Sequence, residues 1–185
     1  TYRCTRDGMH TIIFDLITTD NQIVKVGQYP SFADMVIPDI KKYRTILGKQ
    51  YREFSRAIGL FANGIGIGSY VYLRRIIENL VFDKFSQMST DLSISEEAFY
   101  KLHFDEKIDA LSAFLPDLLV SNKNLYGIVS KGVHELSEEE CLEMFPCIRT
   151  GIELILDDIL TEKEKAKKVK EFEKFVADTT GKFKQ

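Results

Sequence analysis

Residues 68–86, GSYVYLRRIIENLVFDKFS, decide the fold class of this chain. At 100° per residue their apolar side chains gather on one helical face, and further apolar residues widen that face well beyond a stripe. The face consists of Tyr70, Leu73, Ile77, Leu80 and Val81. A helix that is apolar over so much of its circumference has to be covered by neighbours. We therefore expect it at the centre of a helical bundle.

The rest of the chain from residue 31 onwards also has helical patterns. The sequence predicts further helices at 38–48, 50–62, 95–103, 106–115, 117–131 and 137–159. Pro38 suits the first turn of the first of these, and Gly48 its end. Ser137 and Glu140 form a capping box ahead of the last one, which has the clearest amphipathic pattern in the chain.

Two features are expected to divide the C-terminal helical region. Pro146 should kink the helix that follows Ser137, because its ring removes one backbone hydrogen bond. Residues 161–164, TEKE, are expected to restart a separate charged helix. That last helix has a narrow apolar seam, which consists of Val169, Phe172 and Val176.

Two short segments with strand patterns precede the helices. Residues 10–18, HTIIFDLIT, are rich in β-branched and aromatic residues, Asp20 and Asn21 favour a turn, and residues 22–26, QIVKV, alternate. A lone hairpin is only marginally stable, so we expect it to lean on the helices or to complete a small metal module. The predicted fold class is mainly α: a helical bundle over residues 31–185, preceded by a short two-stranded β-hairpin in an appendage over residues 1–30.

The composition is that of an ordinary folded domain. The 185 residues are 44% hydrophobic and 29% charged, which argues against wholesale disorder. No stretch approaches the roughly 18 consecutive apolar residues of a membrane span, so we expect no membrane association. Cys4, Cys141 and Cys147 are too few and too unpatterned for a disulfide framework, which fits the reducing cytoplasm. The sequence leaves open whether the native chain extends upstream of Thr1.

Charge is unevenly distributed, although the net charge is only −3. Residues 135–158 contain eight acids and one arginine, whereas residues 40–56 contain six cations and one acid. The cations are Lys41, Lys42, Arg44, Lys49, Arg52 and Arg56. Because Tyr43, Tyr51 and Phe54 are interleaved with them, this basic segment is a candidate for gripping phosphates and stacking on bases. The alternative is a solvated helical face with aromatic residues in the core.

The segment Gly64-Ile-Gly-Ile-Gly68 precedes the central helix. Glycines before a helix can cradle a phosphate with free backbone amides. The Lys-Ser/Thr pair of a P-loop is absent, however, and the spacing differs from G-x-G-x-x-G. A tight turn between two helices is the preferred interpretation.

Cys4 and His10 could form half of a zinc site beside the hairpin. Tetrahedral zinc needs four ligands, and no Cys-x-x-Cys pair accompanies these two residues. Zinc is therefore expected at the N-terminus only if two more ligands lie upstream, and no other cofactor is indicated. The alternative is a loose N-terminal end.

Three polar residues are candidates for a site within the bundle. Arg74 and Glu78 lie four residues apart on the apolar central helix, where they can pair with each other or line a cavity. His134 lies at the junction of two predicted helices, and an imidazole can act as a general acid or base near neutral pH. The sequence shows no nucleophile beside it, so a turn-stabilising role stays open.

Two segments together resemble a known family. Residues 68–80, GSYVYLRRIIENL, resemble the long central helix of HEPN-superfamily domains, in which a similar Leu-Arg-Arg-x-x-Glu run occurs. Residues 125–156 resemble the later half of the same bundle, where a loop histidine commonly precedes the last core helix. The similarity covers residues 50–160. The chain also resembles a bacterial family of uncharacterised function that has an N-terminal zinc-ribbon-like module.

The resemblance implies an all-α bundle, often dimeric, with roles in RNA cleavage, nucleotide binding, toxin–antitoxin pairs or phage defence. HEPN ribonucleases usually carry an arginine four to six residues before the histidine. Here residues 126–130, YGIVS, contain no arginine. Only His134 therefore matches the motif directly, while Arg74 and Glu78 match polar positions of the central helix.

The leading hypothesis is a non-catalytic HEPN-like module that binds RNA, a nucleotide or a protein partner in bacterial stress or phage defence. One alternative is a metal-independent ribonuclease that uses His134 with Arg74 and Glu78. Another is an oligomerisation scaffold, including a homodimer. Exposure of the three polar residues in one cleft would favour the enzyme, and burial of Arg74 against Glu78 would favour the scaffold.

Overall fold

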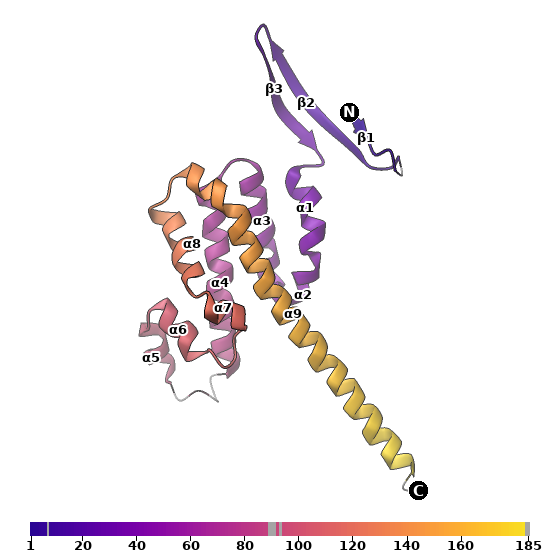
Figure 1. The fold of residues 1–185 in the computed structure, drawn as a ribbon, viewed down its shortest axis with the longest axis vertical. Coiled ribbons are helices and arrows are strands. Elements are labelled where there is room, and N and C mark those ends of the chain that lie inside the picture. The colour runs from indigo at the N-terminus through magenta and orange to yellow at the C-terminus, as the bar shows by residue number, and fades with distance from the viewer. Residues whose placement is uncertain (7, 89–91, 93, 184–185) are drawn as a thin grey trace.

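The computed structural model describes residues 1–6, 8–88, 92 and 94–183 (Figure 1). It is mainly helical with a small antiparallel sheet at the N-terminus, which confirms the predicted fold class. The sheet projects from one end of the bundle, and the C-terminal half of the last helix projects from the other (Figure 1).

The sheet contains the expected hairpin and one additional short strand. Strand β2 (Thr11–Thr19) pairs antiparallel with β3 (Gln22–Tyr29), and β1 (Tyr2–Arg3) pairs with the start of β2. Most of the hairpin extends away from the helices (Figure 1), so the expectation that it packs broadly on them is wrong. Residues 25–28 of β3 share a pocket with Ala62 and Asn63 at the end of α3 (Tyr51–Ala62). The register places Ile17 opposite Val24 and Thr18 opposite Ile23, so apolar side chains fall on both faces. If one face of the hairpin packed on the helices, the apolar side chains of the other face would still be exposed.

One helix and three short helical turns link the sheet to the bundle. Helix α1 (Phe32–Ile40) is followed by the 3₁₀ turn η1 (Lys41–Tyr43), helix α2 (Arg44–Leu47) and the 3₁₀ turn η2 (Gly48–Gln50). The single helix expected between Pro38 and Gly48 is therefore wrong. Pro38 lies inside α1, which Ser31 begins with a capping box, so the helix starts earlier than the proline suggested.

The bundle is built around α4 (Gly66–Met88), against which α3 (Tyr51–Ala62), α8 (Asn124–His134) and α9 (Glu138–Phe183) pack. Tyr70, Leu73, Ile77 and Val81 of the predicted face are buried, and Leu80 is half-buried. The short helices α5 (Glu96–Lys101), α6 (Phe104–Ala110) and α7 (Asp117–Ser121) close one end (Figure 1). None of the helices in the described ranges combines the length and apolar character that crossing a lipid bilayer requires.

Helix α9 is one continuous helix, which corrects the expectation of a second helix from Thr161. The hydroxyl of Thr161 donates to the carbonyl oxygen of Asp157 at 2.9 Å, the bond of a residue inside a helix rather than of a cap. The helix also continues through Pro146. At its start, Ser137 and Glu140 form the predicted capping box, with backbone-to-side-chain distances of 2.8 and 3.2 Å.

Candidate functional site

Arg74, Glu78 and His134 come together where α4 packs on α8. The two helices approach closely at Gly132, which lies against the ring of Tyr70. This contact brings the end of α8 beside the middle of α4, so His134 reaches a residue sixty positions earlier in the chain.

The cluster is held by a hydrogen-bond network. The Nε of Arg74 donates to Oε1 of Glu78 at 2.9 Å, and the hydroxyl of Tyr126 donates to the same oxygen at 2.7 Å. The Nη1 of Arg74 lies 3.4 Å from Nε2 of His134, and its guanidinium lies 5.5 Å from the ring centre of Tyr126. The Tyr126 ring also stacks on Phe104, with ring centres 3.6 Å apart. The carboxylate of Glu78 and the ring of Tyr126 therefore hold Arg74 in place.

This environment changes the acidity of two groups. Burial acts to lower the pKa of Arg74, but the hydrogen bond and charge of Glu78 outweigh it and raise that pKa. Burial, followed by the hydrogen bond to Glu78, raises the pKa of the Tyr126 phenol. Arg74 is thus a permanent cation whose charge Glu78 offsets, and Tyr126 is a neutral hydrogen-bond donor.

The cluster is partly open to solvent. The side chains of Arg74 and Glu78 are 29% and 25% exposed, and His134 is exposed. Exposure of the three residues is expected of an enzyme, and burial of Arg74 against Glu78 is expected of a scaffold. The structure is intermediate, because Arg74 is paired with Glu78 but the pair remains accessible beside His134.

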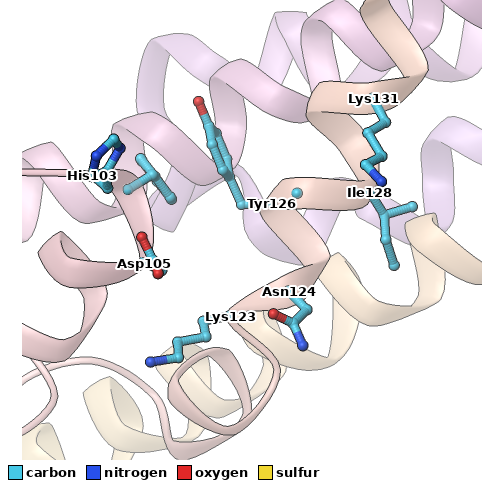
Figure 2. A pocket seen from close by; sticks show the side chains of 9 residues that line it. His103, Asp105, Lys123, Asn124, Tyr126, Ile128 and Lys131 are labelled. Carbon is cyan, nitrogen blue, oxygen red and sulfur yellow. The ribbon is translucent and has the colours of Figure 1, made fainter. Parts of the chain in front are cut away.

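Tyr126 also lines a surface pocket of about 620 Å³ (Figure 2). His103 and Asp105 come from the start of α6, and Lys123, Tyr126 and Lys131 come from α8 or the residue before it. Lys123 is also bound to Asp109 at 2.6 Å. Sequence reasoning did not single out this pocket. The spacing of Lys123, Gly127 and Lys131 at every fourth residue of one helix was the available signal.

The basic segment divides into separate positions rather than one surface. Arg44, Lys49 and Arg52 line a single pocket of about 670 Å³ together with Gly48 and Tyr51. None of these three cations forms an ion pair with a described residue. Because the chain here is divided into α2, η2 and α3, a projection onto one uniform helix does not predict that these three cations share a pocket.

The other three cations of the segment lie elsewhere. Lys42 binds Asp157 at 2.6 Å and lies 4.8 Å from the ring centre of Tyr43, and the hydrogen bond to Asp157 is the main cause of its raised pKa. Lys41 is exposed on η1. Arg56 lines a different pocket of about 510 Å³ with Tyr72.

The glycine-rich segment forms a turn whose amides are already used. Gly64 has a φ of 74°, the left-handed conformation that glycine adopts readily. The backbone amides of Gly66 and Ile67 donate to the carboxylate of Glu138 at the start of α9. Because these are the donors that a phosphate would need, Glu138 occupies the phosphate-binding position of this loop.

Cys4 and His10 face each other across the turn between β1 and β2. The amide of Cys4 donates to the carbonyl oxygen of His10 at 2.8 Å. Within the described residues, no group of three or more His, Cys, Asp or Glu side chains is arranged to hold a metal ion.

Comparisons with family models, curated proteins and solved structures found no match to this chain.

Proposed function

We propose that this chain is a HEPN-like binding module that holds RNA, or a nucleotide derived from it, in the pocket of Arg44, Lys49 and Arg52. The observation that carries the proposal is the convergence of these three cations around half-buried Tyr51, without an acidic partner among the described residues. Unpaired cations supply the phosphate attraction that dominates nucleic-acid affinity, and a tyrosine ring beside them offers a base a stacking surface.

The electrostatics favour this pocket over the Arg74 cluster as the main phosphate site. The charge of Arg74 is offset by Glu78 at 2.9 Å, so a phosphate would have to compete with a carboxylate already in place. Arg44, Lys49 and Arg52 face no such competitor in the described part of the chain. A setting in bacterial stress or phage defence rests on the sequence resemblance alone.

The test is binding of a fluorescent single-stranded RNA, measured by polarisation across a range of salt concentrations. The logarithm of the association constant should fall with the logarithm of salt at about −0.7 per phosphate contacted. The triple variant Arg44→Gln, Lys49→Gln, Arg52→Gln should lose most of the affinity and flatten that slope. The matched control removes three exposed cations elsewhere, through Arg3→Gln, Arg6→Gln and Lys101→Gln. Equal losses in both variants would reject the pocket, and a salt-independent affinity would reject phosphate recognition.

A metal-independent ribonuclease is the second candidate, and one distance favours it. Arg74 Nη1 and His134 Nε2 lie 3.4 Å apart, close enough for both groups to meet one phosphate. In such a reaction His134 takes the proton of a ribose 2′-hydroxyl while the 2′-oxygen attacks phosphorus. The bond to the 5′-oxygen then breaks, a solvent proton reaches that oxygen, and Arg74 stabilises the developing charge.

RNA cleavage in the presence of EDTA separates the two candidates. The binding module leaves the RNA intact. Cleavage by the wild type that is lost in His134→Ala would establish the ribonuclease, because EDTA inactivates metal-dependent contaminating nucleases and a metal-independent contaminant would cleave in both preparations. If the chain neither binds nor cleaves RNA, the scaffold alternative stands.

A further inference from the structure

The C-terminal half of α9 has an apolar face that no described residue covers. From Thr161 onwards the helix extends beyond the bundle (Figure 1), and its described side chains are almost all exposed. Val169, Phe172 and Val176 are 46%, 66% and 43% exposed. These residues form the apolar seam noted in the sequence. We call residues 161–180 the tail.

A second uncovered apolar surface lies on the same helix within the bundle. Cys147, Gly151 and Leu154 of α9 line a groove of about 360 Å³ together with Leu125 and Ile128 of α8. Leu154 is 49% exposed and Ile128 is 40% exposed. A Cβ added to Gly151 would make only ordinary contacts with Leu125, at 3.7 and 3.9 Å, so packing within the chain does not require a glycine there.

The groove and the tail seam lie on one side of α9. Eighteen residues make five full turns at 3.6 residues per turn, so residues separated by eighteen positions point in the same direction. Gly151 and Val169 are related in this way, and so are Leu154 and Phe172. The uncovered face is therefore continuous in direction from Cys147 to Val176, and we call it the α9 face.

We propose that the α9 face binds the α9 face of a second copy of this chain, with the two helices antiparallel. A two-fold axis near residues 161 and 162 places the tail seam of each copy in the groove of the other. In this register Phe172 of the second copy lies opposite Gly151, Val169 opposite Leu154 and Val176 opposite Cys147. The two bundles then lie at opposite ends of a helix pair about 45 Å long.

Size and charge both favour this orientation. A glycine opposite a phenylalanine leaves room for the ring, as large and small residues interdigitate in packed helices. Asp158 lies on the same face as Val176, and both Asp158 and Lys165 are exposed. The antiparallel register places Lys165 of the second copy opposite Asp158. In a parallel pair, Asp158 would instead lie beside Asp158 of the second copy, and Lys165 beside Lys165. Repulsion between these like charges disfavours the parallel orientation.

The chain's own Cys147, which is exposed, makes the register testable by crosslinking. Val176→Cys should form a disulfide-linked dimer under a mild oxidant, and the link should be lost when Cys147→Ala is added. The two positions lie about 44 Å apart along one helix, so the disulfide cannot form within one chain. A crosslink that persists without Cys147, in a chain that also carries Cys4→Ala, would indicate parallel tails and overturn the proposal. Failure of Val176→Cys to crosslink would also overturn it.

The mass in solution, measured by light scattering during size-exclusion chromatography, supplies a second test. Phe172→Glu should change the particle from two chains to one, and Ala177→Glu should not. Both positions are exposed, and Ala177 lies 140° around the helix from Phe172. Circular dichroism should show the same folded bundle in both variants, since neither side chain packs against it. A wild type that is monomeric at all accessible concentrations would overturn the proposal.

Discussion

The ring of Tyr70 fills the space that Gly132 leaves open between α4 and α8. A Cβ placed on Gly132 would overlap Cδ1 of Tyr70. Both residues are buried. This contact sets the separation of the two helices, and with it the approach of His134 to Arg74.

We expect Gly132→Ala to destabilise the protein, because the new methyl group has to displace a buried aromatic ring. Overpacking of this kind costs about 1–3 kcal/mol. Urea unfolding followed by circular dichroism should show a lower midpoint.

The control for this variant lies on the same helix. A Cβ on Gly127 would meet no atom within 4 Å, so Gly127→Ala gains helix propensity without a clash. It should stabilise the protein by up to about 1 kcal/mol. If both alanine variants shift stability in the same direction, close packing at Gly132 does not control the α4–α8 separation.

Tyr70→Phe should leave stability at neutral pH unchanged or raise it. The Tyr70 hydroxyl is buried and has no hydrogen-bond partner among the described residues, so its removal relieves an unmatched polar group. Unfolding free energies at pH 7 for the two proteins check this. A loss above about 1 kcal/mol would mean that the hydroxyl has a partner, such as a buried water.

The same variant has a distinct alkaline signature. Burial raises the pKa of Tyr70 to about 12 from an ordinary value of 10. The unfolded state therefore releases this proton first, and the stability linked to Tyr70, which is intact below pH 10, is lost as pH rises through 12. The wild type should lose more stability over that range than Tyr70→Phe. Tyr100→Phe, which removes an exposed hydroxyl, should follow the wild type.

Glu138→Ala should cost about 1 kcal/mol through loss of the cap on α4. Its carboxylate accepts from the amides of Gly66 and Ile67, which have no partner one turn earlier in their own helix. Glu139→Ala changes the neighbouring exposed acid and should shift stability by less than about 0.5 kcal/mol. Equal thermal midpoints for the two variants would show that the cap contributes nothing.

Local sequence patterns predicted the central helix α4, but the single helix expected at 117–131 is wrong, because α7 ends at Ser121 and α8 begins at Asn124. The apolar face of α4 could be read directly, because an amphipathic pattern is set within a few turns of one helix. The continuity of α9 could not, since Thr161 and Glu164 have the residue types of a capping box. The choice between a cap and a helix interior depends on whether the preceding residues are already helical, and at Asp157 they are.

The sequence predicted one contact of the candidate site and missed the others. Arg74 and Glu78 pair within one helix, and their spacing alone predicts the contact. The approach of His134 depends on the packing of Gly132 against Tyr70, and the role of Tyr126 depends on a hydroxyl that reaches across to α4. Neither contact leaves a local pattern in the sequence.

The α9 pairing predicts that two charges can be exchanged. Asp158→Lys places a lysine opposite the partner's Lys165, and Lys165→Asp places an aspartate opposite the partner's Asp158. Each single variant should therefore weaken the dimer, because like charges meet twice across the two-fold axis. The double variant restores opposite charges at both contacts and should recover much of the wild-type dissociation constant, as measured by analytical ultracentrifugation. In a parallel pair the double variant would not recover affinity, since position 158 still faces position 158 and position 165 still faces position 165, with like charges at both. Recovery in the double variant thus depends on the antiparallel orientation, and additive weakening would rule that orientation out.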